Sequence, residues 1–229
     1  MGDGRRPPES DGGLTARERA GVEGRFGVVL LLLLVAVFFS VSAPEGSWSV
    51  LLTTVLLAFS LAVAMRASGA RARAVRMWWA IAALGVGASV LIASTQDARA
   101  AGGYLALTSL LLTVGAIGAI VRRLRLQTEV SLLTVTGAVC VYVLLGLSLA
   151  FVSEAVGDLG SHPFFASQEG GTRGDYVYFS FVTMATVGYG DLAPQSGLAR
   201  ALAVTGGLVG QIYLVTAVAA LVGNLGRRR

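Results

Sequence analysis

Cysteine, histidine and lysine are almost or wholly missing from this chain of 229 residues. It has one cysteine, Cys140, and one histidine, His162, and all 18 of its basic residues are arginines. A single cysteine excludes a disulfide within the chain and a cysteine-built metal site. With one histidine, no Ser/His/Asp set or metal cluster can be assembled, so an enzyme and a bound cofactor are not expected. Cys140 lies between two valines and is expected to be a packed apolar side chain.

Charge is also scarce, since charged residues make up 14% of the chain and hydrophobic residues 55%, with a mean hydropathy of +0.72. A soluble domain has about a quarter of its residues charged. The deficit argues against an ordinary cytosolic enzyme and indicates that lipid is the main solvent. The formal net charge of +5 is typical of basic loops at the inner leaflet, and no nucleic-acid partner is expected.

Six apolar blocks interrupt the chain. Four of 18 residues each would rise about 27 Å as helices, close to the roughly 30 Å of a bilayer core. Backbone N–H and C=O groups cannot stay without hydrogen bonds in lipid, so the expected fold is an all-α membrane protein with six transmembrane helices. The four shorter blocks are 26–43, 48–65, 77–94 and 104–121, and the two longer ones are 130–153 and 198–222.

The positions of the arginines predict which ends of the spans face the cytoplasm. Fifteen of the 18 fall before the first block, between the second and third, between the fourth and fifth, or after the sixth. The positive-inside tendency then places both termini in the cytoplasm of a multi-pass plasma-membrane (inner-membrane) protein. Residues 1–25 are polar and mixed in charge, and we expect them to form a disordered cytoplasmic tail. Cleavage of 26–43 as a signal peptide is the alternative, disfavoured by its length and by the charged tail before it.

Residues 154–197, between the last two blocks, contain no apolar run long enough to cross a bilayer. Asp175 is a candidate N-cap for a helix of about ten residues, half a membrane deep. Six residues then read Thr186, Val187, Gly188, Tyr189, Gly190 and Asp191. We therefore predict a short helix over 175–185 that enters the membrane without crossing it, followed by a loop over 186–191 and preceded by an irregular segment over 154–174.

The six-residue loop resembles the selectivity filter of the potassium channel superfamily, and Thr183 completes the longer form of that motif. The resemblance implies that 175–185 is a re-entrant pore helix and that 154–174 is the turret before it. A permeating ion must exchange its water shell for oxygens, which backbone carbonyls can supply if successive residues aim them inward. Such a backbone needs alternating unusual angles, which Gly188 and Gly190 adopt without a Cβ penalty. Four such strands must surround one ion path, so a homotetramer is expected.

The resemblance also implies roles for individual residues. K+ as the permeant ion would be coordinated by the carbonyls of Thr186, Val187, Gly188 and Tyr189 and by the Thr186 hydroxyl. Tyr189 would brace the filter against Tyr178 or Phe179, and Asp191 would sit at the extracellular mouth. Two positions depart from the pattern of some bacterial pores. Val182 stands where those carry a glutamate, so Asp191 must find another partner, and Ala185 replaces a second threonine.

The last block carries two candidate gate residues. Gly210 falls where the family has its hinge glycine, although Gly206 and Gly210 also form a small-residue pair that favours close helix packing. An amide side chain is costly in lipid, so Gln211 should face the cavity or a neighbouring helix.

Gating is not evident from the remaining sequence. The region 26–121 occupies the position of a voltage sensor, but none of its four apolar blocks contains an arginine, so strong voltage gating is not expected. The residues after the last block, the basic cytoplasmic tail 223–229, are too few for a ligand-binding domain. Arg122, Arg123 and Arg125, in a predicted linker over 122–129, are candidates for binding anionic lipid heads.

Two other readings remain. A potassium-uptake transporter subunit normally carries four degenerate loops in one long chain. A non-conducting partner subunit with an intact filter is compatible with the sequence, and a regulatory subunit could supply the gate. The arginine-rich, alanine- and glycine-rich composition indicates a GC-rich bacterial genome.

Overall fold

The computed structural model describes residues 16–42, 47–67, 72–94, 98–126, 132–166 and 171–225. Within them the chain forms seven α-helices and no strand, apart from an isolated bridge between Phe165 and Pro194. The helices are α1 (Ala16–Ser42), α2 (Ser47–Ala67), α3 (Ala72–Ala93), α4 (Ala98–Arg125), α5 (Leu132–Leu159), α6 (Arg173–Met184) and α7 (Gly197–Leu225).

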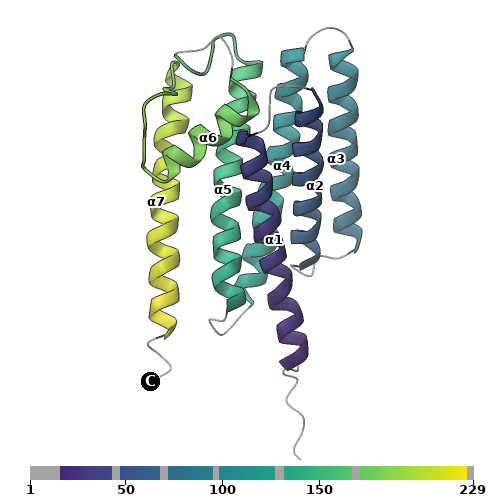
Figure 1. The fold of residues 1–229 in the computed structure, drawn as a ribbon, viewed down its shortest axis with the longest axis vertical. Coiled ribbons are helices and arrows are strands. Elements are labelled where there is room, and N and C mark those ends of the chain that lie inside the picture. Colours follow the sequence, from purple (N-terminus) through teal and green to yellow (C-terminus); the bar gives the residue numbers. More distant parts are fainter. Residues whose placement is uncertain are drawn as a thin grey trace, which may run out of the picture.

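The helices α1 to α4 lie together on one side of α5, and α7 stands on the other side (Figure 1). Contacts are densest between α4 and α5, and α1 also packs on α5 and α6. The short α6 lies between the upper parts of α5 and α7 in the view of Figure 1. Helix α6 therefore contacts both α5 and α7.

The core is centred on α5, where Leu144 and Leu147 have no exposed surface and Phe151 is 1% exposed. Lipid is as apolar as these side chains, so close van der Waals packing holds such helices together. Glycines make this packing possible: a Cβ on Gly146 would lie 2.6 Å from the Phe181 ring. Cys140 is fully buried against α1, which confirms that it is a packed side chain.

Four helices are long and apolar enough to cross a membrane, within Ala72–Ile92, Arg99–Arg125, Thr134–Leu159 and Gly197–Gly223. Two shorter apolar stretches, Phe26–Ser42 and Thr54–Ala67, fall below that length among the described residues. An all-helical membrane protein is thus confirmed, while the count of six spans stays a prediction.

Several predicted boundaries are wrong. Helix α1 begins at Ala16, ten residues inside the predicted tail, because good helix formers such as arginine, glutamate and alanine continue it outward. Helix α4 continues through Arg125, so the three candidate lipid arginines lie in its last turn and not in a separate linker. Helix α5 continues to Leu159, six residues into the predicted turret. Helix α7 takes in the first residues of the predicted tail, and 226–229 lie outside the described residues.

Candidate functional site: the loop after the pore helix

Helix α6 begins with a capping box. Thr172 is the N-cap, and its hydroxyl accepts a 3.2 Å hydrogen bond from the Asp175 N–H. The Asp175 carboxylate in turn accepts a 2.8 Å bond from the Thr172 N–H. The prediction of Asp175 as the N-cap is therefore wrong, since it occupies the third helical position and returns the bond. The helix accordingly runs over Arg173–Met184, with Ala185 as its C-cap.

The loop after this helix has an alternating backbone. Thr186, Gly188 and Gly190 have φ angles of 55°, 57° and 83°, whereas Val187 and Tyr189 between them are not in the positive-φ region. Glycine adopts such angles freely, but a threonine there is strained by roughly 1–2 kcal/mol. The sequence analysis predicted the two glycines and missed Thr186, because nothing in its side chain signals a left-handed backbone.

The N–H groups of the loop turn back toward α6. The Val187 N–H donates to the Val182 carbonyl at 3.0 Å, the Gly188 N–H donates to the same oxygen at 3.4 Å, and the Thr186 N–H donates to the Thr183 carbonyl at 3.0 Å. In a trans peptide the C=O points opposite to the N–H that follows it. The carbonyls of Ala185, Thr186 and Val187 therefore point away from α6. The loop thus presents a row of carbonyl oxygens on one side.

That side of the loop is exposed in the single chain. Val187 and Tyr189 are 51% and 71% exposed, and residues 185–191 are all exposed. A run of carbonyls directed at open space can be satisfied by water, by a cation or by further protein.

The rim of the loop is braced by one aromatic side chain. The Tyr178 hydroxyl donates a 2.8 Å hydrogen bond to the Asp191 carboxylate, and its ring stacks on Tyr189 at 6.4 Å and 6°. Phe179 faces the other way and packs edge-on against Phe164 and Phe165. Of the two predicted braces, only Tyr178 contacts Tyr189. Asp191 thereby has a partner, although Val182 replaces the glutamate, and this bond raises the pKa of Tyr178.

A buried ion pair holds the start of α6, and the sequence analysis missed it. Nε of Arg173 lies 3.1 and 3.2 Å from the two carboxylate oxygens of Glu154 on α5, and both side chains are under 10% exposed. Nη1 donates a 3.0 Å bond to the Thr54 hydroxyl on α2, and the guanidinium lies 5.6 Å from the Phe151 ring centre. The available signal was Glu154 at the very end of an apolar block.

The inner helix α7 approaches α6 and α5 through glycines. A Cβ on Gly210 would lie 2.9 Å from the Met184 carbonyl oxygen, and one on Gly206 would overlap the Leu149 side chain. Close packing therefore accounts for both glycines, and a hinge at Gly210 stays a prediction. Gln211, the next residue, donates a 3.3 Å hydrogen bond to the Thr186 hydroxyl.

The remaining predicted site lies far along the chain from the loop. Arg122 and Arg125 are exposed in the last turn of α4, and Arg123 is half-buried. Basic residues at a helix C-terminus also complement its dipole, which requires no lipid.

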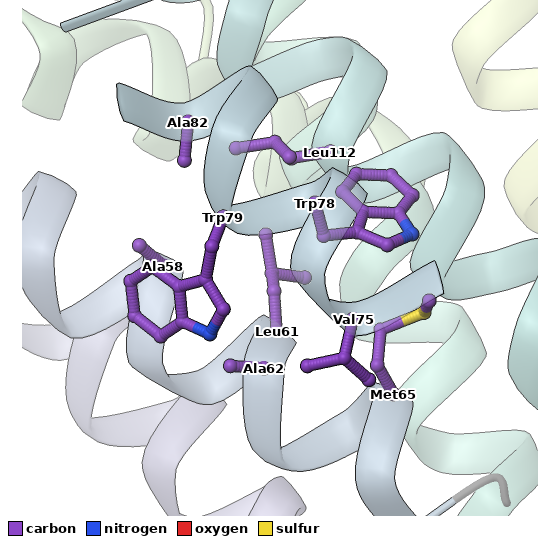
Figure 2. A pocket seen from close by; sticks show the side chains of 9 residues that line it. All are labelled: Ala58, Leu61, Ala62, Met65, Val75, Trp78, Trp79, Ala82 and Leu112. Atoms are coloured by element: carbon purple, nitrogen blue, oxygen red, sulfur yellow. The ribbon is translucent and has the colours of Figure 1, made fainter. Parts of the chain in front are cut away.

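A groove among α2, α3 and α4 carries no candidate chemistry (Figure 2). It holds about 320 Å³ of empty space, including the part open to the surroundings, and no titratable side chain lines it. No group of three or more potential metal ligands occurs in the described part of the chain. The lining side chains are Ala58, Leu61, Ala62, Met65, Val75, Trp78, Trp79, Ala82 and Leu112.

Comparison with known proteins points to the same part of the chain. A family profile described as "Ion channel" matches residues 132–227, which contain α5, α6, the loop and α7. No curated protein matches the chain at a significant level. The matched segment contains all of the loop and its braces, and it leaves out α1 to α4.

Proposed function

From the match of residues 132–227 to an ion-channel family and the resemblance of the loop to a potassium-channel filter, we propose that the protein conducts K+ selectively and passively across the plasma membrane. Four copies of the chain surround one pore, each contributing the loop from Thr186 to Asp191. The carbonyls of Thr186, Val187, Gly188 and Tyr189 replace the water of the ion.

The observation that carries this proposal is the alternating backbone of the loop. Positive φ angles at Thr186, Gly188 and Gly190 combine with N–H groups that donate to α6. Carbonyls aligned on one side match the coordination that a dehydrated K+ requires. The bonds from Thr186 and Val187 to α6 are those of an ordinary helix C-cap, so the feature that favours a filter is the alternation of φ that continues through Gly188 and Gly190.

The exposure of α7 supports assembly into a tetramer. Nine large apolar side chains of α7 are exposed, together with the polar side chains of Thr205, Gln211 and Thr216. Lipid covers apolar side chains but not polar ones, so the polar groups should face a water-filled cavity or other protein. Four copies arranged around the loops would provide both. Cross-linking of the purified protein measures the number of copies directly.

The test of selectivity is the reversal potential of purified, reconstituted protein under bi-ionic K+ and Na+ conditions. We expect a clear preference for K+, and Tyr189→Asp should reduce it while tetramers still form. The matched control is Tyr104→Asp on α4, a half-exposed tyrosine outside the matched segment, which should leave selectivity unchanged. Equal permeability of the wild type would contradict the proposal, and the absence of any current would favour a non-conducting subunit.

The three arginines at the end of α4 enter the proposal as a lipid contact. Near an anionic leaflet each arginine contributes about 1 kcal/mol of attraction, and only a difference between open and closed states would shift gating. Open probability in liposomes with and without anionic lipid tests this, for the wild type and for a variant with all three arginines changed to glutamine. The same open probability in all four conditions would leave them a topology signal only.

A further inference from the structure

One polar side chain of α7 reaches the inner end of the loop. Gln211 Nε2 donates a 3.3 Å hydrogen bond to Oγ1 of Thr186, and both residues are exposed in the single chain. Gln211 is preceded by Leu208, Val209 and Gly210 and followed by Ile212, so it interrupts an apolar stretch. An amide is expensive in such a setting unless it has a partner, and the Thr186 hydroxyl is that partner.

Two contacts hold Gln211 at the level of Thr186. On one side, Gly210 lies directly against the last turn of α6, where a Cβ would come within 2.9 Å of the Met184 carbonyl oxygen. On the other, the Tyr213 hydroxyl donates a 2.7 Å bond to the Ala138 carbonyl on α5, and its ring stacks on Tyr142 at 6.1 Å. The segment carrying Gln211 is therefore fixed to both α6 and α5.

Thr186 is the residue of the loop that most needs such support. Among the described residues it is the only one other than glycine with a positive φ, at 55°. Its hydroxyl has one hydrogen and two lone pairs. When the Gln211 amide donates to one lone pair, the orientation of the oxygen is restricted and the second lone pair stays available.

We propose that Gln211 is a positioning residue for the innermost cation site of the loop. Its amide N–H holds the Thr186 hydroxyl so that the second lone pair of Oγ1 faces a dehydrated cation of the size of K+. The inference rests on the proposed channel function, in which four such hydroxyls ring the inner entrance. A ligand oxygen that is already oriented costs less free energy to recruit than one that must be ordered by the ion.

The test uses Ba2+, a divalent cation of nearly the same size as K+, applied from the cytoplasmic side of the reconstituted full-length protein. Gln211→Met keeps the side-chain length and removes the hydrogen bond, and it should weaken Ba2+ block by about fivefold, the effect of losing one hydrogen bond. The control is Thr108→Val on α4, outside the matched segment, whose hydroxyl bonds the Tyr104 carbonyl within its own helix. Block of the control should match the wild type.

A second pair of variants separates positioning from general stability. Gln211→Asn keeps the amide but is one methylene shorter, so it should weaken Ba2+ block as Gln211→Met does while tetramer stability is unchanged. In a Thr186→Val background, Gln211→Met should produce no further change, since no hydroxyl is left to position.

The outcomes distinguish this inference from the proposed function. Wild-type Ba2+ block in either Gln211 variant, with K+ selectivity intact, would overturn the positioning role and leave the channel function standing. A wild-type protein that fails to select K+ over Na+ would overturn both. Equal weakening of block by Gln211→Met with and without the Thr186 hydroxyl would also overturn the role.

Discussion

Helices α3 and α7 are almost equally exposed, but they expose different chemistry. Only 6% of the most apolar window of α3 is buried, and 11% of that of α7, against 56% for α5. Between Met77 and Leu91, every exposed residue of α3 whose side chain is described is apolar or glycine. Those of α7 include Thr205, Gln211 and Thr216.

The difference shows that exposure in a single membrane chain has two meanings. Lipid can cover α3, and the apolar groove beside it contains nothing that would require a polar partner. It cannot satisfy the polar groups of α7 or the carbonyls of the adjoining loop. The surface of α7 is therefore where protein partners or water are needed, and α3 is where they are not.

The largest expected effect comes from the ion pair that ties α6 to α5. Arg173→Leu leaves Glu154 buried without its partner, which should cost about 3–5 kcal/mol of stability. Thermal denaturation followed by size-exclusion chromatography measures this loss. Arg200→Leu on α7, an exposed arginine, should change stability by less than about 0.5 kcal/mol.

A double variant sharpens the same test. Arg173→Leu combined with Glu154→Leu removes both charges and should recover most of the lost stability, because the cost lies in the unpaired charge. If the double variant were as unstable as Arg173→Leu alone, the pair would not be the cause.

Alanine substitutions of glycines should have effects of intermediate size on stability, and these effects should differ between α7 and α3. Gly210→Ala places a methyl group against the Met184 backbone and should cost about 1–3 kcal/mol. Gly87→Ala on α3 meets nothing within 4 Å and should be neutral or stabilising by up to about 1 kcal/mol. The midpoint of thermal denaturation compares the two variants, and equal destabilisation would show that α7 is not closely packed there.

A smaller effect is expected from the brace on the loop. Tyr178→Phe keeps the ring that stacks on Tyr189 and removes the hydrogen bond to Asp191. We expect K+ current that declines faster during sustained opening, with selectivity retained. Current recorded over seconds from the variant and from the wild type tests this.

The same bond predicts a dependence on alkaline pH. The pKa of Tyr178 is raised because its protonated hydroxyl donates to Asp191. A raised folded-state pKa means that the contribution is fully present below the usual tyrosine value of about 10 and is lost as pH rises through the folded-state pKa. The decline of current should therefore quicken above about pH 10 in the wild type and not in Tyr178→Phe. An identical alkaline response in both would rule out Tyr178 as its source.

The smallest effect is expected from voltage. The apolar stretch of α4 carries no arginine between Tyr104 and Val121, and its basic residues Arg122, Arg123 and Arg125 lie in the last turn. Open probability should change little between −100 and +100 mV. Over this range, the field does about 4–5 kcal/mol of work on each charge that crosses the membrane. An e-fold change in fewer than about 10 mV would require several charges to cross the membrane, and would make the leading helices a sensor.

The sequence by itself determined the helical membrane character, the position of the loop and the residues of its motif. Apolar length, arginine placement and the glycine alternation are local properties, which each segment carries without reference to its neighbours. The helix ends were less accessible, because α5 continues to Leu159 and Thr172 rather than Asp175 caps α6. Side chains that satisfy each other across a turn decide such boundaries.

Only the tertiary structure decided which residues support the loop. The pairing of Arg173 with Glu154 joins residues 19 positions apart, its bond to Thr54 spans 119, and the contact of Gln211 with Thr186 spans 25. The left-handed backbone of Thr186 likewise follows from N–H groups that reach the end of α6. The free-energy cost of a buried charge or a strained backbone angle is offset by contacts with residues that are close in space. The sequence alone does not show which residues those are.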